Sequence, residues 1–326
     1  MKYSREKLNS FSGEKVDKSE YDSIAQELVK SVLEGKNVSL AEESFACSII
    51  KLLRKDGTNE LAFDISQVEK CKNYRFKNAY LLYFSDLNGH KQVIDPSGVI
   101  SEKQKTLDVT FLENEYQIWK KLLKGETQKN NLTGYLARET EHQIKELHSY
   151  GSQSMLGSNY IKYLEKSLTL HGKYIYLTVK ESFEEIGNPE INFNDGNNNF
   201  IIDSYSYVHT LFRHFAKSIK QHQIDKSYHF DQNIKFDNIP NFILELLKCY
   251  STSNFSKSFN KQNIYFKYKG SSYAIWFRKL KKNIKGGSTA EFLRVQTLYP
   301  VENSEELEKI QKLNSEITNC NFEFFQ

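Results

Sequence analysis

Histidine and arginine side chains are concentrated in one short segment of the chain. Four of the eight histidines fall within 21 residues (His209, His214, His222 and His229), and Arg213 lies among them. Histidine exchanges protons near neutral pH, and the guanidinium group of arginine matches the geometry of phosphate oxygens. Cutting RNA without a metal requires a base for the 2′-hydroxyl, an acid for the departing 5′-oxygen and a cation for the phosphorus oxygens. These residue types therefore indicate metal-independent RNA cleavage, for which no cofactor is expected.

A helix is expected to position these side chains, starting at Asp203 or Ser204 as cap and running to about residue 221. His209 and Arg213 are four residues apart and therefore neighbours on it. His214 lies about 140° round from His209 on a wheel of 100° per residue. The two histidines then act from two edges of one cleft, or one of them is structural. The expected buried stripe consists of Val208, Leu211, Phe212, Phe215 and Ile219.

The charge of the chain is distributed unevenly. Residues 204–300 contain 16 lysines and arginines against 5 aspartates and glutamates, a net charge of +11. The whole chain carries +4, so the remainder carries −7 (4 − 11). A basic region of this kind favours a polyanion as partner, most simply RNA or DNA. The side chains expected to bind the substrate are Lys217, Arg278, Lys281, Lys282 and Tyr299, with Thr297 as a further hydroxyl on the last strand.

Length and turn signals favour two domains in an α+β chain of 326 residues. Asn, Asp, Gly and Pro cluster between residues 187 and 199, which predicts a linker and a boundary near residue 190. Residues 1–189 are expected to be mostly helical with a small antiparallel sheet, and residues 190–326 to pack helices on a short antiparallel sheet. In the first domain, helices are expected at 19–35, 39–56, 113–124, 133–148 and 158–170, and strands at 79–84, 92–94, 107–112 and 173–179. In the second, strands are expected at 200–202, 264–268, 273–277 and 292–299, a basic loop at 279–289, and helices at 204–221, from 238 onward and at 303–315.

Cysteine usage and hydropathy suggest a location. Cys47, Cys71, Cys249 and Cys320 form no close C-x-x-C pair, so neither a zinc site nor a redox motif is indicated. We therefore expect free thiols in a reducing compartment. The sequence contains no run of about 18 apolar residues, so no membrane span is expected. The polar N-terminus lacks the apolar segment of a signal peptide. A cytoplasmic protein without a membrane partner is expected.

Three segments resemble a known nuclease family. The segment Val208-His209-Thr210-Leu211-Phe212-Arg213-His214 resembles the H-x-L-x-R-H helix of the phage-type barnase/EndoU/colicin E5-D/RelE-like (BECR-fold) nucleases. The apolar helix introduced by Phe236-Asp237-Asn238-Ile239-Pro240 is similar to theirs, as is the final strand that closes on Thr297-x-Tyr299-Pro300. The resemblance covers roughly residues 195–300.

The resemblance implies a fold and a set of catalytic residues. The fold is helices on a short antiparallel sheet, and the activity is metal-independent endoribonuclease cleavage of RNA, with tRNA as one candidate substrate. By position, His209, Arg213, His214 and Thr297 would be catalytic. Members of the family often lie at the C-terminus of phage, mobile-element or toxin proteins, so an inhibitor or antitoxin protein is a further expected partner.

Two alternatives use the same residues. A nucleic-acid-binding protein without catalytic activity would use the same basic surface, and its affinity would fall steeply with salt. An all-helical ribonuclease of the HEPN kind would need its histidine closer to the arginine than here, where eight residues separate Arg213 from His222. The strand signals at 264–299 argue further against it.

Overall fold

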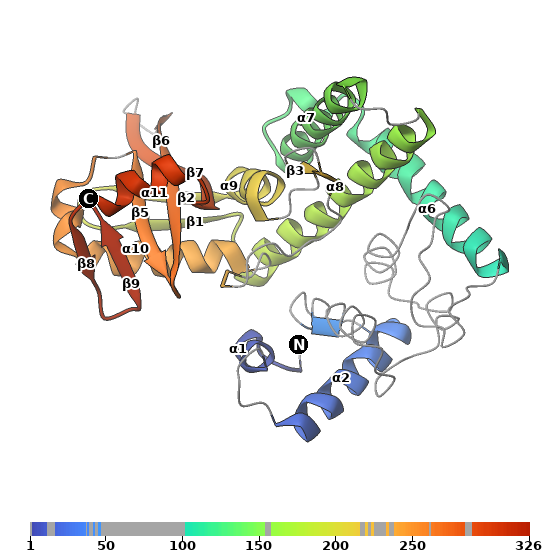
Figure 1. Cartoon of the computed structure of the whole chain (residues 1–326), viewed down its shortest axis with the longest axis horizontal. Helices are drawn as coiled ribbons and strands as arrows, with labels where there is room; N and C mark the ends of the chain where they lie inside the picture. The colour runs from blue at the N-terminus through green and yellow to red at the C-terminus, as the bar shows by residue number, and fades with distance from the viewer. Residues whose placement is uncertain are drawn as a thin grey trace. The chain divides into compact units, whose positions relative to one another are not determined.

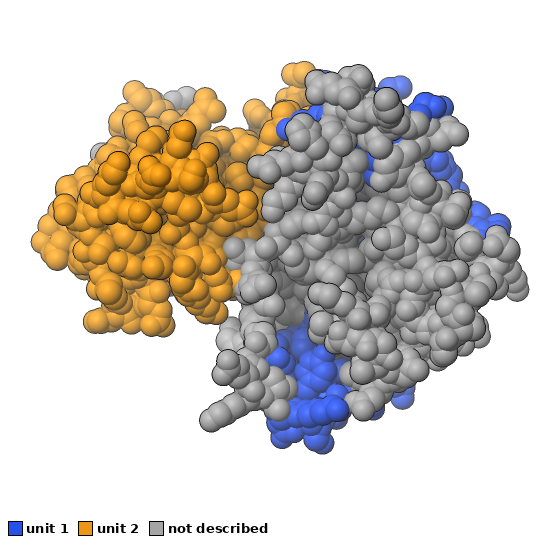
Figure 2. Space-filling model, viewed as in Figure 1, with its two compact units in different colours: residues 1–124, 143–178 blue, residues 125–142, 179–326 orange. Residues whose placement is uncertain are grey.

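The computed structural model describes two compact units, residues 1–124 with 143–178 and residues 125–142 with 179–326 (Figure 2). Helices α7 (Leu132–Gln153) and α8 (Ser158–Ile186) each contribute residues to both units. The expected boundary at residue 190 stays a prediction. The described residues are 2–11, 17–36, 38, 42, 45–46, 102–153, 158–215, 219–220, 223–224, 233–234, 238–260, 262–283 and 289–326.

The described part of the first unit is helical. It contains α1 (Arg5–Ser10), α2 (Lys18–Leu33) and α6 (Glu102–Leu123), together with the second half of α7 and most of α8. The helix expected at 19–35 is confirmed as α2. Its cap is Asp17, whose side chain accepts hydrogen bonds from the Ser19 and Glu20 amides. The helices expected at 113–124, 133–148 and 158–170 correspond to parts of α6, α7 and α8, with α6 ending at Leu123.

Two strands expected in this unit are wrong. Residues 107–112 lie inside α6 and residues 173–179 inside α8. Residues of 173–179 pack against α6: the Tyr176 and Trp119 rings lie 5.2 Å apart, and buried Lys173 is paired with buried Glu115. Tertiary packing therefore overrides strand propensity. The expected strands at 79–84 and 92–94 lie outside the described residues, as does most of the helix at 39–56.

The second unit contains a seven-stranded sheet in the order β1-β2-β7-β6-β5-β9-β8 (Figure 1). Neighbours are antiparallel except β2 and β7, which are parallel. The α+β class is confirmed, but the sheet is larger than expected and mixed. Its strands are β1 (Glu190–Asn194), β2 (Asn199–Asp203), β5 (Asn263–Tyr268), β6 (Ser271–Asn283), β7 (Thr289–Pro300), β8 (Ser315–Ile317) and β9 (Phe322–Phe325), and a separate ladder pairs β3 (Ile219–Lys220) with β4 (Gln223–Ile224).

The Asn- and Gly-rich segment expected to be a linker forms the β1–β2 hairpin instead. Its turn is closed by Asp195, whose Oδ1 accepts hydrogen bonds from the Asn197 and Asn198 amides at 2.8 and 2.6 Å. Gly196 takes a φ of +94°, which favours glycine. Turn-forming residues thus build a tight reversal between two strands, and the strand expected at 200–202 is confirmed as part of β2.

Two helices cover opposite faces of the sheet (Figure 1). Helix α10 (Ile239–Thr252) has Pro240 in its first turn, and its Phe242 ring lies 6.2 Å from that of Phe266. Helix α11 (Ser304–Gln311) packs Ile310 against Ala274 on the other face. The helix expected at 303–315 is therefore confirmed in part, because its last residue already belongs to β8.

The β5–β6–β7 meander is longer than expected. Strands expected at 264–268, 273–277 and 292–299 are confirmed, and the turn between the first two has positive φ at Lys269 and Gly270. Residues 279–283, expected to be loop, continue β6 and pair with residues 289–293 of β7. Residues 279–283 were not predicted as a strand, because this lysine-rich segment lacks the alternating apolar residues that indicate one.

A disulfide joins α10 to the turn between β8 and β9. It links Cys249 to Cys320 across 71 residues of sequence. The expectation of free thiols is therefore wrong for these two cysteines, whereas Cys47 and Cys71 lie outside the described residues. Disulfides are rare in reducing compartments, so the cytoplasmic location stays a prediction.

Replacing both Cys249 and Cys320 with serine is expected to lower the free energy of unfolding by about 4 kcal/mol, because closing a loop of this length restricts the unfolded chain. Urea unfolding followed by tryptophan fluorescence measures the loss. The control is alkylation of the denatured, unreduced protein, in which Cys249 and Cys320 should remain unmodified. Modification of both thiols would contradict the bond.

Candidate functional site

Helix α9 (Ser204–Thr210) carries the first predicted site residue and is shorter than expected. The Asp203 and Ser206 side chains form a capping box at its start, which confirms Asp203 as cap. A π-helical turn, Leu211–Phe215, follows it, so the ideal wheel fails beyond residue 210. The buried stripe of Val208, Leu211, Phe212 and Phe215 is nevertheless confirmed. Ile219, expected to extend it, lies in strand β3.

Small polar side chains fix α9 against the edge of β7. Strand β2 pairs with β7 only at Leu293 and Arg294. Beyond that point the Ser206 hydroxyl donates to the Val295 carbonyl at 2.6 Å, and the Thr210 hydroxyl accepts from the Leu298 amide at 3.3 Å. Helix α9 thereby satisfies backbone groups that a neighbouring strand would otherwise bind.

The carboxylate of Glu139, on α7, joins the two predicted neighbours His209 and Arg213. Its Oε1 lies 2.9 Å from His209 Nδ1, and its Oε2 accepts from Arg213 Nε at 2.8 Å. The three side chains are 12%, 22% and 27% exposed, in the order Glu139, His209, Arg213. All three belong to the second unit. The cluster is partly shielded from water, which strengthens its electrostatic interactions.

Hydrogen-bonding chemistry fixes the proton positions in this cluster. A carboxylate only accepts, so His209 Nδ1 carries a proton, and in the neutral ring Nε2 keeps its lone pair. Arg213 only donates, so its contact with His142 makes Nε2 of that ring the acceptor. His209 thus has a base nitrogen, and Arg213 is held from two sides by residues of α7.

Opposing effects act on the pKa of Glu139. Burial by itself raises the pKa of this carboxyl, but the hydrogen bond from His209 and the charges of His209 and Arg213 outweigh it. The pKa of Glu139 is therefore held below its ordinary value. The carboxylate stays ionised at neutral pH and can stabilise a positive charge on His209.

An aromatic layer orients the His209 ring. The Tyr205 ring stacks on it with centroids 5.6 Å apart and planes within 10° of each other. The Arg294 guanidinium carbon lies 4.1 Å from the centre of the Tyr205 ring, and the Gln296 amide donates to the Tyr205 hydroxyl. Gln296 is the extra residue of β7 where the β6–β7 register shifts, so a bulge aims this side chain toward α9.

His214 contacts different residues from His209. Its ring stacks on that of Tyr299 with centroids 5.0 Å apart. The Tyr299 hydroxyl donates to Glu306 Oε1 at 2.8 Å and accepts from Trp276 Nε1 at 3.1 Å. Burial, followed by the Glu306 hydrogen bond, raises the pKa of Tyr299. This hydroxyl is therefore neutral at physiological pH.

The remaining predicted site residues are dispersed. The Thr297 hydroxyl is buried without a hydrogen-bond partner in the described structure, and the residue faces Trp276 on β6. Arg278 is exposed on β6, and Lys281 Nζ lies 3.7 Å from Glu291 Oε1. The Lys282 side chain and Lys217 lie outside what the structure describes. The roles of these five residues stay predictions.

Sequence reasoning missed Glu139, His142, Tyr205 and Arg294. Glu139 lies 70 residues before His209 on a separate helix, and no local pattern connects the two. The spacing of Tyr205 and His209, four residues apart on one helix, was the one signal that could have identified a neighbour.

The chain matches no protein-family model, no curated protein and no solved structure. The resemblance to the BECR-fold nucleases therefore stays an expectation. Within the described ranges, three or more metal-ligating side chains do not converge. Helices in those ranges also lack the combination of length and apolar character needed to cross a membrane.

Proposed function

We propose that the protein is a metal-independent endoribonuclease whose base is His209. The observation that carries the proposal is the shared carboxylate of Glu139, which holds His209 at Oε1 and Arg213 at Oε2. A carboxylate, an imidazole and a guanidinium in direct contact supply orientation, proton transfer and positive charge within one cluster.

Each residue of the cluster takes part in the proposed reaction. His209 Nε2 takes the 2′-hydroxyl proton as the 2′-oxygen bonds to phosphorus, and the bond from phosphorus to the 5′-oxygen breaks. The proton then passes from His209 to the departing 5′-oxygen. Glu139 orients the ring and stabilises its protonated form, as carboxylates do beside catalytic histidines. Arg213 places positive charge beside the phosphorus oxygens.

His214 and Thr297 are left out of the proposed catalytic set. His214 stacks on Tyr299, whose hydroxyl is bonded to an acidic residue, and this neighbourhood repels a phosphodiester. The Thr297 hydroxyl is buried without a polar partner. A place among the BECR-fold nucleases, a role as a toxin or mobile-element effector and an antitoxin partner remain parts of the proposal that rest on the residue pattern alone.

Binding of RNA without cleavage is the second candidate function. The exposed Arg278 of β6 favours it, because a surface cation binds phosphates whether or not a base is present. It predicts salt-dependent complexes and intact RNA at every time point.

The test is incubation of the full chain with total tRNA in EDTA, followed by a denaturing gel. We expect fragments that accumulate with time in the absence of a free divalent metal ion. The full chain is required because a fragment that starts at residue 190 lacks Glu139. If the RNA stays intact while a stable protein–RNA complex forms, the proposed cleavage is contradicted and RNA binding without cleavage is supported.

A further inference from the structure

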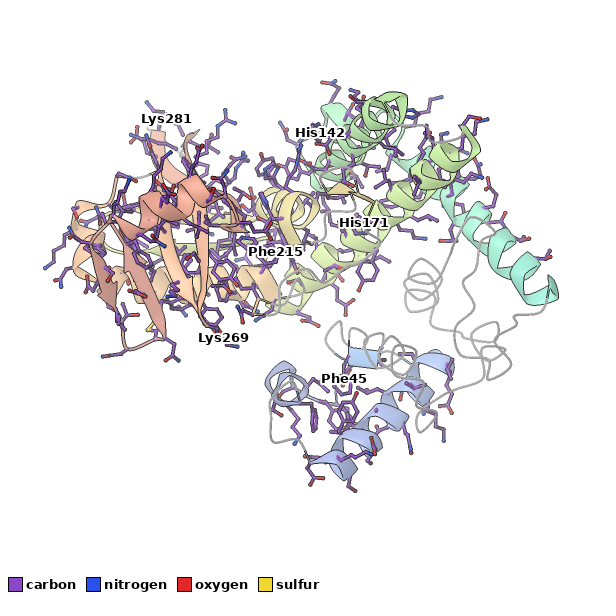
Figure 3. All side chains as sticks on the ribbon, in the orientation of Figure 1. Phe45, His142, His171, Phe215, Lys269 and Lys281 are labelled. Carbon is purple, nitrogen blue, oxygen red and sulfur yellow. A yellow bond between two sulfur atoms is a disulfide. The ribbon has the colours of Figure 1, made fainter. Side chains whose placement is uncertain are left out.

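The β6–β7 ribbon extends beyond the rest of the sheet. Strand β5 pairs with β6 no further than Trp276, and β2 pairs with β7 only at Leu293 and Arg294. The ribbon continues to the pair Asn283 and Thr289, and the described strands supply no third partner there. We call residues 278–283 and 289–294 the arm. Figure 3 shows Lys281 toward the arm's end of β6.

The two faces of the arm differ in how their cations are engaged. Residues directly opposite on paired strands point to the same face, and successive residues alternate. Lys279 and Lys281 share a face with Glu291, which contacts their ammonium groups at 2.5 and 3.7 Å. Arg278 lies opposite Arg294 on the other face. Among the described residues, the exposed Arg278 has no acidic partner.

The Arg278 face leads to the proposed site. Its neighbour across the ribbon, Arg294, covers the Tyr205 ring, which stacks on His209. Arg294 is itself held, with Nη1 3.9 Å from an oxygen of Asp203. Among the described residues, Arg278 is therefore the first cation without an acidic partner on moving along this face from His209 toward the arm.

Acidic residues of helix α11 lie on the same face of the sheet, at the end away from the arm. Helix α11 packs over Ala274 and against Trp276 and Tyr299, which share this face with Arg278. Its Glu305 and Glu308 are exposed, and Glu306 binds Tyr299. A polyanion bound at His209 is repelled from α11 and attracted toward the arm.

We infer that RNA runs from His209 along the Arg278 face of the arm and that Arg278 binds a backbone phosphate next to the cleaved one. The inference rests on the proposed function for the identity of the polyanion. The guanidinium fork suits two phosphate oxygens, and contact with the backbone requires no particular base. The opposite face, where Glu291 neutralises the lysines, stays free of RNA.

Adjacent residues provide a matched pair of variants for the test. Arg278→Ala and Lys279→Ala each remove one exposed positive charge from the same strand, but on opposite faces. The probe is a short fluorescein-labelled 2′-O-methyl RNA, which lacks the 2′-hydroxyl and cannot be cut by the proposed reaction. Fluorescence anisotropy with the full chain gives its Kd at several salt concentrations.

Arg278→Ala is expected to raise the Kd roughly tenfold by removing a charged hydrogen bond, and to lower the salt dependence by about 0.7 in log–log slope, the share of one phosphate. Lys279→Ala should change neither measurably. Equal effects of the two variants, or failure of the wild-type chain to bind the probe, would overturn the inference. Binding with the expected contrast but without tRNA cleavage would keep the inference and remove the proposed catalytic function.

Discussion

Replacing His209 with alanine is expected to slow the cleavage of tRNA by about 10²- to 10⁴-fold, the usual contribution of a positioned base. The His209 ring is held by Glu139 and stacked on Tyr205, so its Nε2 has a defined direction. Initial rates of cleavage in EDTA, measured at saturating tRNA for wild-type and variant, give the ratio.

His214→Ala is the matched control for this prediction. Both variants remove one imidazole from neighbouring turns of the chain, but His214 packs on Tyr299 and has no place in the proposed reaction. Its cleavage rate should stay within a factor of about three of the wild-type rate, because a loss of a catalytic acid or base would lower the rate at least about 10²-fold. A large loss of rate with His214→Ala and little loss with His209→Ala would show that His209 is not the base.

Glu139→Gln is expected to lower both stability and activity. The amide cannot accept from His209 and Arg213 with the strength of a carboxylate, which leaves the Arg213 guanidinium poorly compensated in a partly buried cluster. We expect a loss of about 3 kcal/mol in the free energy of unfolding at neutral pH, the lower end for breaking a buried ion pair. Urea unfolding of both proteins measures it.

The stability difference between wild-type and Glu139→Gln should depend on pH in one direction. The folded-state pKa of Glu139 lies below its ordinary value, because the His209 and Arg213 contacts outweigh the opposing effect of burial. The stabilisation is therefore present above the unfolded pKa of about 4.3 and is lost as the pH falls below it. The two unfolding free energies should converge under acid conditions. A constant difference at all pH values would show that the Glu139 charge is not responsible.

Local patterns predicted most of the second unit. The capping residue Asp203, the buried stripe from Val208 to Phe215 and the strands at 264–268 and 273–277 each follow from local residue patterns, and all are confirmed. The errors lie where distant contacts decide the conformation. Residues 173–179 have the composition of a strand, but packing between α6 and α8 makes them helical.

The candidate site was predicted only in part for the same reason. The spacing of His209 and Arg213 predicted that they are neighbours, and Glu139 joins them. Glu139 lies on a helix that is distant in sequence, and the pairing of Cys249 with Cys320 spans 71 residues. Contacts of this range leave no periodic signal, and a single sequence provides no other means of pairing them.

The chemistry of the cleaved RNA ends tests the central claim most directly. After incubation of total tRNA with the full chain in EDTA, mass spectrometry of the fragments should show 2′,3′-cyclic phosphates, because the 2′-oxygen is the nucleophile that His209 activates. With His209→Ala these ends should form about 10²- to 10⁴-fold more slowly. Fragments that carry 3′-hydroxyl ends, or cyclic phosphates formed equally well by His209→Ala, would contradict the account.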